Sequence, residues 1–322
     1  MSDLPLTKDR FAERRMVLSS TVHRPSSTSA ILRRSIGMLA DAGADSPRLS
    51  AEALLAHVLG ITRIQLLARP EQPVAQDACA RFERLIARAA AAEPLAYLTG
   101  HREFYGLGFV VDARVLVPRP ETELLIDLAL GPQSPAEVQA SHLQCLDVGT
   151  GSGCIAVALA VHFGSAHITA LDVSADALAV ARLNAERLGD VDRVTFIHSD
   201  LLSRVGPLNP DFRLPTSKLQ PPAYDLLCAN LPYIPADELR RLPVARHEPA
   251  LALDGGHDGL ELIRRLLAQA PRVMAPQGRL LLEIGATQGQ AVAALARAAF
   301  PEAHVGVHQD LAGLDRVVEI TL

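Results

Sequence analysis

The sequence contains few of the residues that form disulfides and metal sites. Its four cysteines include no C-x-x-C pair, and its eleven histidines are scattered without an H-E-x-x-H spacing. Three of the cysteines lie within or beside apolar runs, which is typical of buried free thiols. We therefore expect free thiols, no metal site and a reducing, cytoplasmic setting.

The chain also lacks long apolar runs and an excess of positive charge. Charged residues or prolines interrupt every apolar stretch before it reaches the length that spans a membrane. The net charge of -5 argues against a protein that works on bulk nucleic acid. Residues 1–29 are polar, rich in Ser and Arg and without an apolar signal core, so we expect a disordered tail there.

The apolar content is sufficient for one large domain and a smaller one. The chain has 322 residues, of which 49% are hydrophobic, and a chain of this size buries a substantial core. Residues 30–92 carry apolar side chains at helical spacing, with stops at Gly43 and Gly60 and with Ser50 as an expected N-cap. This pattern predicts a small helical domain, either a recognition module or a structural cap.

Residues 93–127 are expected to form a connecting segment that contains a β-hairpin. Two short alternating runs flank a Gly-containing turn between residues 101 and 117. Pro118 and Pro120 then prevent further regular strand pairing. The stretch "ETELLIDLAL" follows as a predicted helix, whose acidic first turn suits the helix dipole.

Strands and helices alternate through residues 128–322, which predicts an α/β catalytic domain with a doubly wound, mostly parallel sheet. The expected strands are 143–148, 167–172, 193–198, 224–229, 278–284, 303–308 and 316–322. The expected helices are 152–163, 174–188, 236–242, 259–274 and 287–299. A short loop joins the last two strands, so we expect them to be antiparallel. Residues 203–223 contain five prolines and predict an irregular loop, either a spacer or a lid.

A glycine-rich loop lies between the first of these strands and its helix. The stretch "CLDVGTGSGCIAVALA" places Gly149, Thr150, Gly151, Ser152 and Gly153 at that turn. Glycines let a backbone turn tightly and approach a ligand closely, and a loop that leads into a helix suits an anionic or polar ligand. Taken alone, the loop is also compatible with a plain turn or with a dinucleotide site.

Acidic residues follow the next two strands. Asp172 ends the second strand, where a carboxylate accepts hydrogen bonds from ribose hydroxyls. Asp200 and Leu201 end the third strand, where an acid can receive an exocyclic amine and an apolar side chain can pack on adenine. The pattern "DVGTGSG" resembles class I S-adenosylmethionine-dependent methyltransferases, because the third glycine of the dinucleotide fingerprint falls one position later.

The fourth strand is followed by "NLPY", which is Asn230, Leu231, Pro232 and Tyr233. An amide or aromatic amine nitrogen has a delocalised lone pair, so a methyltransferase must hold it in line with the methyl carbon. The Asn230 side-chain carbonyl and the Leu231 backbone carbonyl can accept its two N–H groups. Pro232 stiffens the loop, and the Tyr233 ring can pack on a planar substrate group. The alternative is a structural turn with a core tyrosine.

Four segments together resemble one family. The segments 94–127, 146–160, 230–235 and 247–267 are similar, in this order, to the protein-(glutamine-N5) methyltransferases of the HemK/PrmC type. The stretches "VPRPETELL" and "EPALALDGG" are the most specific. The resemblance implies S-adenosyl-L-methionine as cofactor and a helical N-terminal domain that docks a peptide chain release factor. The methyl acceptor would be the glutamine of the factor's Gly-Gly-Gln loop.

This resemblance assigns cofactor binding to residues 149–153, Asp172, Asp200, Leu201 and Asn230, and acceptor binding to residues 230–233. Two positions depart from the family pattern. The usual acceptor motif is Asn-Pro-Pro-Tyr, and Leu231 stands at its second position, which keeps the backbone carbonyl but reduces the stiffness of the loop. Leu201 stands where an aromatic residue is frequent, so less stacking is expected.

Three alternative functions remain at this point. The "NLPY" motif also resembles ribosomal RNA adenine dimethyltransferases, but the acidic balance and the preceding helical segment disfavour a direct nucleic-acid substrate. A glutamine methyltransferase that acts on a ribosomal protein is a nearer alternative. A non-catalytic binding module with the same fold is disfavoured by the intact glycine loop, Asp172 and Asn230.

Overall fold

The computed structural model describes residues 27–131, 142–189, 191–205 and 223–322. The chain separates into two compact units. The smaller holds residues up to Asp41 and Asp45–Ile86, and the larger holds Ala42–Ala44 and Ala87–Leu322. The expected tail at 1–29 and the proline-rich loop at 203–223 fall almost entirely outside the described residues, and the domain boundaries expected from the sequence remain predictions.

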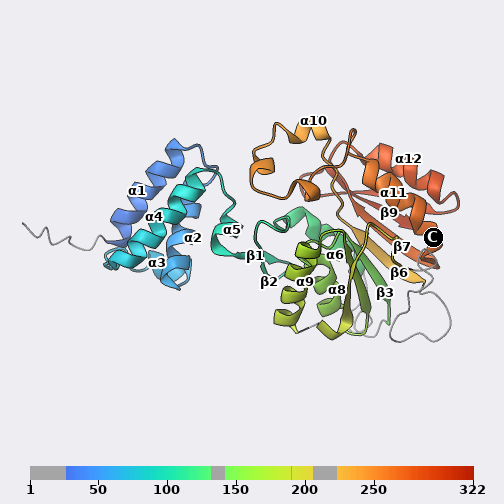
Figure 1. Ribbon diagram of the computed structural model, residues 1–322, viewed down its shortest axis with the longest axis horizontal. Coiled ribbons are helices and arrows are strands. Elements are labelled where there is room, and N and C mark those ends of the chain that lie inside the picture. The colour runs from blue at the N-terminus through green and yellow to red at the C-terminus, as the bar shows by residue number, and fades with distance from the viewer. Residues whose placement is uncertain (1–26, 132–141, 190, 206–222) are drawn as a thin grey trace, which may run out of the picture. The chain divides into compact units, whose positions relative to one another are not determined.

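The smaller unit is built from helices (Figure 1). These are α1 (Thr28–Asp41), α2 (Pro47–Leu59), α3 (Arg63–Leu67) and most of α4 (Gln76–Ala90). Apolar side chains at helical spacing, among them Leu39, Leu54 and Phe82, are fully buried between them.

One helix start in this unit differs from the expected position. Ser50 lies inside α2 and is not its N-cap, because Ser46 precedes the helix and Pro47 opens it. Proline suits the first helical position, where its fixed φ fits and its missing N–H has no partner to lose. The stop at Gly60 is confirmed, since this residue ends α2 at φ 65°.

In the larger unit, the end of α4 is followed by helix α5 (Leu95–Thr99) and by the predicted hairpin, which is confirmed. Strands β1 (His101–Phe104) and β2 (Leu107–Val110) pair antiparallel. Tyr105 and Gly106 form the turn with positive φ at both residues, a geometry that matches the twist of a two-residue hairpin. A 3-10 turn at Pro120–Thr122 then leads into α6 (Glu123–Leu130).

Seven strands form one sheet in the order β5-β4-β3-β6-β7-β9-β8. They are β3 (Gln144–Val148), β4 (His167–Asp172), β5 (Val194–His198), β6 (Tyr224–Ala229), β7 (Met274–Glu283), β8 (His304–Gln309) and β9 (Asp315–Thr321). The first five in that order are parallel, and β9 runs antiparallel to both β7 and β8. The mostly parallel sheet with an antiparallel C-terminal pair is therefore confirmed.

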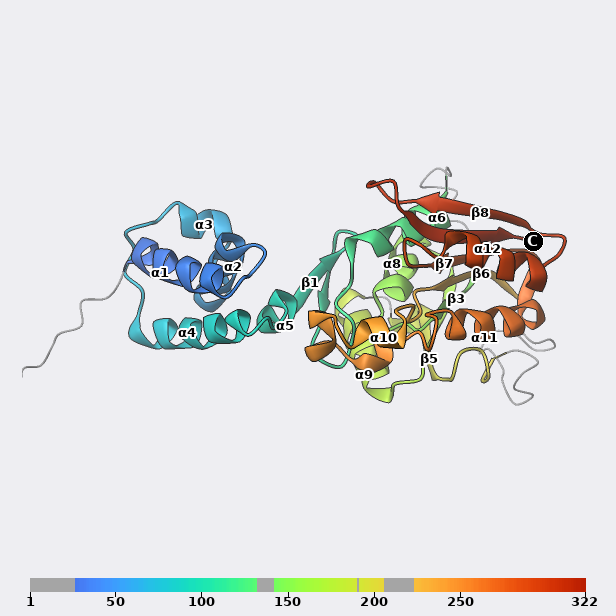
Figure 2. The same cartoon turned by 90° about the horizontal axis from the view of Figure 1, so that it is seen from above.

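Helices cover both faces of this sheet (Figure 1). One face packs against α6, α8 (Cys154–His162) and α9 (Ala175–Leu188), and the other against α11 (Glu261–Gln269) and α12 (Gly289–Ala299). Helices α11 and α12 lie side by side (Figures 1 and 2). The predicted helix 259–274 is too long, because Pro271 lies in a 3-10 turn after α11 and β7 already begins at Met274.

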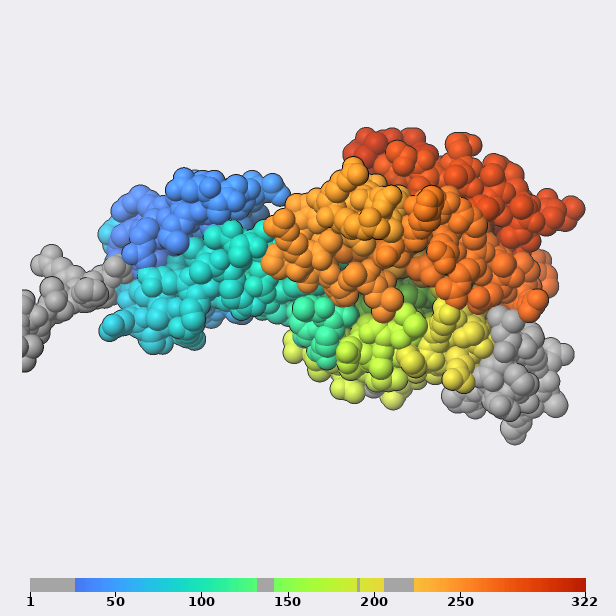
Figure 3. Space-filling view, turned by 45° about the horizontal axis from the view of Figure 1, so that its top comes forward, coloured from blue at the N-terminus to red at the C-terminus, as the bar shows by residue number. Residues whose placement is uncertain are grey.

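Between β6 and α11 the chain forms α10 (Ala236–Leu239) and two 3-10 turns, Pro243–Arg246 and Ala250–Ala252. This segment, coloured orange, lies on the surface of the larger unit (Figure 3). Across the described ranges, every helix is too short or too polar to cross a lipid bilayer. Because β3 has β4 on one side and β6 on the other, the strand order changes direction there, and ligands of open α/β sheets bind at such a point.

Candidate active site

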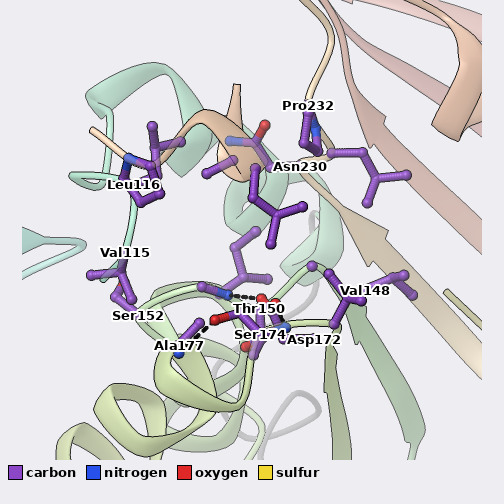
Figure 4. A pocket seen from close by; sticks show the side chains of 18 of the residues that line it. Val115, Leu116, Val148, Thr150, Ser152, Asp172, Ser174, Ala177, Asn230 and Pro232 are labelled. Atoms are coloured by element: carbon purple, nitrogen blue, oxygen red, sulfur yellow. Dashed lines mark hydrogen bonds between the residues drawn. The ribbon is translucent and has the colours of Figure 1, made fainter. Parts of the chain in front are cut away.

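A cavity of about 350 Å³ opens at the carboxyl ends of the parallel strands. We call it the larger cavity. Asn230 and Pro232 lie on one side of it and Thr150, Asp172 and Ser174 on the other (Figure 4). The sequence-predicted residues that line it are Gly149, Thr150, Gly151, Ser152, Asp172, Asp200, Leu201, Asn230, Leu231 and Pro232.

The glycine loop takes a backbone path that favours glycine. Gly149, Gly151 and Gly153 have φ values of 78°, 55° and 81°, a region that is strained for residues with a Cβ. Gly153 is not among the residues that line the larger cavity. It packs instead on Ala181 of α9, which would lie 3.0 Å from a Cβ added at Gly153.

The loop is held by β4 and by a buried carboxylate. The N–H groups of Gly149 and Thr150 both donate to the carbonyl of Leu171, at 2.8 and 2.9 Å. Asp147 accepts hydrogen bonds at Oδ2 from the Thr150 hydroxyl at 2.6 Å and from the Ala156 N–H at 3.0 Å. Burial raises the pKa of Asp147 to about 7, although both hydrogen bonds act to lower it. Asp147 therefore fixes the loop to the start of α8.

Asp172 ends β4 with its carboxylate against the glycine loop. Its Oδ2 accepts from the Gly151 N–H at 2.9 Å, and its Oδ1 accepts from the Ser174 N–H at 2.8 Å. Burial raises its pKa, while these backbone donors act in the opposite direction. A carboxylate has about four acceptor positions, so lone pairs remain for the hydroxyls of a ligand in the cavity.

The end of β5 contributes a paired acid and a strained leucine. The Asp200 side chain is 55% exposed and forms an ion pair with Arg265 at 2.6 Å. Leu201 is buried at φ 48°, and the Ser199 hydroxyl donates to its carbonyl at 2.7 Å. A non-glycine residue in this region is uncommon and marks a local constraint. Arg265, which also lines the larger cavity, carries no signal in the sequence.

Asn230 follows β6, and its side chain is anchored on one side only. Its Nδ2 donates to Thr122 Oγ1 at 3.1 Å, which leaves Oδ1 as a free acceptor of the amide. Leu231 is 4% exposed, and its Cδ2 lies 3.1 Å from the position of a Cβ added at Gly149. The "NLPY" motif and the glycine loop therefore lie against each other.

A smaller cavity of about 170 Å³ adjoins the same motif. Its lining includes Tyr233 and Glu283, neither of which lines the larger cavity. Six residues line both cavities: Leu116, Arg119, Asn230, Leu231, Pro232 and Ala252. The first residues of "NLPY" thus separate two cavities, one on each side, and Tyr233 belongs to the smaller one alone.

Two buried groups meet in the smaller cavity. The Tyr233 hydroxyl donates to Glu283 Oε1 at 3.4 Å. Burial raises the pKa of Tyr233 to about 12, and the charge of Glu283 adds to this effect. Burial also raises the pKa of Glu283 to about 7, while the Thr122 hydroxyl and the charge of Arg316 act against it.

The segments that carry the two most specific motifs are tied together beside these cavities. Glu248, which is buried, accepts at Oε2 from the Val117 N–H at 3.0 Å. Its Oε1 accepts from the Arg119 guanidinium at 2.6 Å. The stretches "VPRPETELL" and "EPALALDGG" therefore meet through one carboxylate, a contact that the sequence alone did not predict.

Comparisons with known proteins agree with this geometry. A family model described as the PrmC N-terminal domain matches residues 30–100, and a methyltransferase domain matches residues 145–220. The release factor glutamine methyltransferase of Moorella thermoacetica is 43% identical over 290 residues, which are 88% of this chain and 96% of that protein. The chain belongs to the release factor glutamine methyltransferase family.

Two further family members show the same extent of similarity. The enzyme of Cereibacter sphaeroides is 43% identical over 293 residues, covering 90% of this chain and 97% of its own. That of Nitratidesulfovibrio vulgaris is 40% identical over 305 residues, covering 91% and 96%. As a family member the chain is a methyltransferase, and its methyl donor is S-adenosylmethionine.

The larger cavity fits this methyl donor. Its volume of about 350 Å³ lies in the range of small-molecule sites. It combines carboxylates for polar groups, at Asp172 and Asp200, with the apolar side chains of Leu201 and Ile155. In the described parts of the chain, His, Cys, Asp and Glu form no group of three or more that could hold a metal ion.

Two site residues were missed by sequence reasoning although the sequence carried a signal for each. Thr122 lies inside "VPRPETELL", one of the two most specific stretches, and the family resemblance assigns no role to its hydroxyl. Glu283 ends the apolar strand β7, as Asp172 ends β4, so it is an acid at one more strand end. The same reasoning that selected Asp172 and Asp200 selects Glu283 as well.

Proposed function

We propose that this protein transfers the methyl group of S-adenosylmethionine to the side-chain amide nitrogen of the glutamine in the Gly-Gly-Gln motif of a peptide chain release factor. One observation carries the proposal. The Asn230 amide turns its NH2 group to Thr122, at the wall that separates the two cavities. Its oxygen is then available to accept an N–H from a substrate amide.

The residues of this wall perform the positioning that the reaction needs. A primary amide nitrogen has two N–H groups, and Asn230 Oδ1 and the Leu231 backbone carbonyl accept one each. Fixed acceptors orient the nitrogen without reorganisation during the reaction. When bound, S-adenosylmethionine supplies a methyl group activated by its positive sulfonium. No strong base is required, because the nitrogen loses its proton late.

The two cavities divide the substrates between them. The larger one holds the cofactor, with Asp172 accepting from the ribose hydroxyls and with Asp200 and Leu201 on the adenine side. The smaller one receives the glutamine side chain, with the Tyr233 ring against its planar amide. This division is supported by Asn230 and Leu231, which line both cavities.

The helical segment at 30–92 is proposed to dock the release factor, with residues 93–127 as connection and 128–322 as catalytic domain. The match of the PrmC N-terminal domain model to residues 30–100 supports this division. A cytoplasmic location follows from the substrate and is in keeping with the buried free thiols Cys145, Cys154 and Cys228.

A labelled methyl-transfer assay tests the proposed substrate. The protein is incubated with S-adenosylmethionine labelled in its methyl group and with a release factor, a mixture of ribosomal proteins, or ribosomal RNA. We expect label on the release factor. Label on a ribosomal protein or on RNA alone would replace the proposed substrate, and a failure to bind S-adenosylmethionine in calorimetry would contradict the enzyme function itself.

A further inference from the structure

The orientation of the Asn230 amide decides whether the site can work. An asparagine side chain presents a carbonyl oxygen at one corner and an NH2 group at the other, and the two are similar in size. Only the orientation with the oxygen toward the acceptor can receive a substrate N–H. In the structure the NH2 group points to Thr122 Oγ1, at 3.1 Å. Some feature must favour this orientation over its reverse.

Thr122 can select the orientation only if its own hydrogen points elsewhere. A hydroxyl has one hydrogen to donate and lone pairs to accept with. If the Thr122 hydrogen pointed to Asn230, the amide would turn its oxygen to Thr122 and its NH2 group to the acceptor. If that hydrogen is engaged by another group, Thr122 can only accept from Asn230, and the productive orientation results.

The Glu283 carboxylate is the candidate acceptor for this hydrogen. Glu283 and Thr122 are each 2% exposed, and the Thr122 hydroxyl is among the groups that lower the pKa of the Glu283 carboxylate. Glu283 Oε2 is buried and has no hydrogen-bond partner among the described residues, so its lone pairs are open to that hydrogen. An ionised carboxylate can only accept, so in a hydrogen bond between the two side chains Thr122 must be the donor.

We propose that Glu283 is a positioning residue which, through the Thr122 hydroxyl, holds the Asn230 amide with its oxygen toward the methyl acceptor. The inference rests on the proposed function, because it explains how Asn230, the residue proposed to bind the methyl acceptor, is oriented. Glu283 acts on Asn230 through another side chain, from its place in the lining of the smaller cavity. It extends the acceptor machinery from the end of β6 to the end of β7.

The proposal makes the orientation depend on pH. A protonated Glu283 can donate to Thr122 Oγ1, which frees the threonine hydrogen to turn toward Asn230 and reverses the amide. Burial places the pKa of Glu283 at about 7, so ionisation occurs near neutral pH and the productive orientation gains population as the pH rises. The charged and titratable groups that surround Glu283 are Tyr233, Arg316, Glu121 and Arg119.

The test combines methyl-transfer kinetics with a signal that needs no substrate. The kinetic variants are Glu283→Gln and Thr122→Val, with Thr122→Ser as the variant that restores the hydroxyl. The matched control is Thr169→Val, which removes another hydroxyl that is 2% exposed and whose partner is Tyr224 at 3.4 Å. The second signal is the NMR resonance pair of the Asn230 side-chain NH2 group, assigned by its loss in Asn230→Ala and followed from pH 5 to 9.

We expect kcat to fall about 10- to 100-fold in Glu283→Gln and Thr122→Val, the range that misplacement of one positioning group costs, while the affinity for S-adenosylmethionine changes little. Thr122→Ser recovers most of the lost rate, and Thr169→Val keeps the wild-type rate. The wild-type rate rises with pH through the ionisation of Glu283, and both damaging variants lose this dependence. The Asn230 NH2 resonances shift over the same pH range in the wild type alone.

The two readouts separate failure of the inference from failure of the proposed function. If the wild type methylates a release factor but the Asn230 resonances titrate identically in Glu283→Gln, the inference is wrong and the function stands. If those resonances lose their titration in Glu283→Gln while no release factor is methylated by the wild type, the positioning link stands and the proposed substrate is wrong. The inference is also wrong if both Glu283→Gln and Thr122→Val have the same kcat as the wild type.

Discussion

The side chain of Leu231 lies directly on Gly149, with its Cδ2 3.1 Å from the position that a Cβ on Gly149 would occupy. One residue belongs to the "NLPY" motif after β6 and the other to the glycine loop after β3. Leu231 stands where the family pattern has proline, so in this chain it is a leucine side chain that contacts Gly149. It fills the space above the glycine loop with a buried apolar side chain.

Gly149→Ala should weaken binding of S-adenosylmethionine by about tenfold or more. The added Cβ meets Leu231, and the φ of 78° costs a residue with a Cβ about 1–2 kcal/mol. The double variant Gly149→Ala/Leu231→Ala removes the steric part and should recover a portion of the affinity. Calorimetric titration measures both affinities. Equal affinity of the single and double variants would show that the Leu231 side chain does not clash with the Cβ added at position 149.

Leu231→Pro should keep methyl transfer within about tenfold of the wild type, because the backbone carbonyl that we propose as acceptor of the substrate N–H is retained. Stability should fall by about 1–3 kcal/mol, since a buried leucine side chain loses its contact with the glycine loop. Steady-state kinetics and urea denaturation measure the two effects. A loss of transfer without a loss of stability would show instead that the leucine determines what the site accepts.

Asp172→Asn should weaken binding of S-adenosylmethionine by about 10- to 100-fold, and Asp200→Asn by only a few-fold. The Asp172 carboxylate is fixed by the N–H groups of Gly151 and Ser174 and faces the cavity. The Asp200 side chain is half exposed and already paired with Arg265, and exposed pairs contribute little. Calorimetry ranks the two, and the reverse order would contradict the assignment of Asp172 to the ribose.

Much of this fold could be predicted because it depends on local patterns. Apolar strands alternate with amphipathic helices, and that alternation forces a parallel sheet with helices on both faces. The ends of parallel strands meet at one edge, so the sequence predicts that Gly149, Asp172 and Asn230 lie close together, and all three line the larger cavity. The errors concern ends of elements, such as Ser50, where the proline at position 47 sets the start of the helix.

The parts of the site that could not be predicted depend on contacts across long stretches of sequence. The bond from Asn230 to Thr122 joins residues 108 positions apart, and no periodicity encodes which hydroxyl an amide will meet. The pairing of Arg265 with Asp200 spans 65 positions. Gly153 lies within the glycine motif but packs on α9 instead of lining the cavity, a difference that the motif itself does not contain.

Glu283→Gln should change the pH dependence of stability in a defined direction. Burial raises the pKa of Glu283 from 4.5 to about 7 in the folded protein. Between these values the folded state keeps a proton that the unfolded state releases, so this group's contribution falls as the pH rises, by up to about 1.4 kcal/mol per pH unit. The variant should therefore gain stability relative to the wild type from pH 5 to 7, measured by urea denaturation.

Glu319→Gln provides a control in which the effect on stability changes with pH in the opposite direction. Burial raises the pKa of Glu319, but hydrogen bonding and charge from Arg279 outweigh burial, so its pKa is lowered. Its contribution is present above the unfolded pKa and is lost as the pH falls through the lower folded value. The variant should lose stability relative to the wild type as the pH rises from acidic to neutral. The same trend in both variants would contradict the account of Glu283.

The central claim is that the amide clamp at Asn230 directs the methyl group to one glutamine nitrogen. Mass spectrometry of a release factor after incubation with the protein and S-adenosylmethionine tests it most directly, with Asn230→Ala alongside. We predict one methyl group on the glutamine of the Gly-Gly-Gln motif with the wild type and none with the variant, while the variant binds S-adenosylmethionine with similar affinity. Methylation of another residue, or an unchanged yield with Asn230→Ala, would contradict the account.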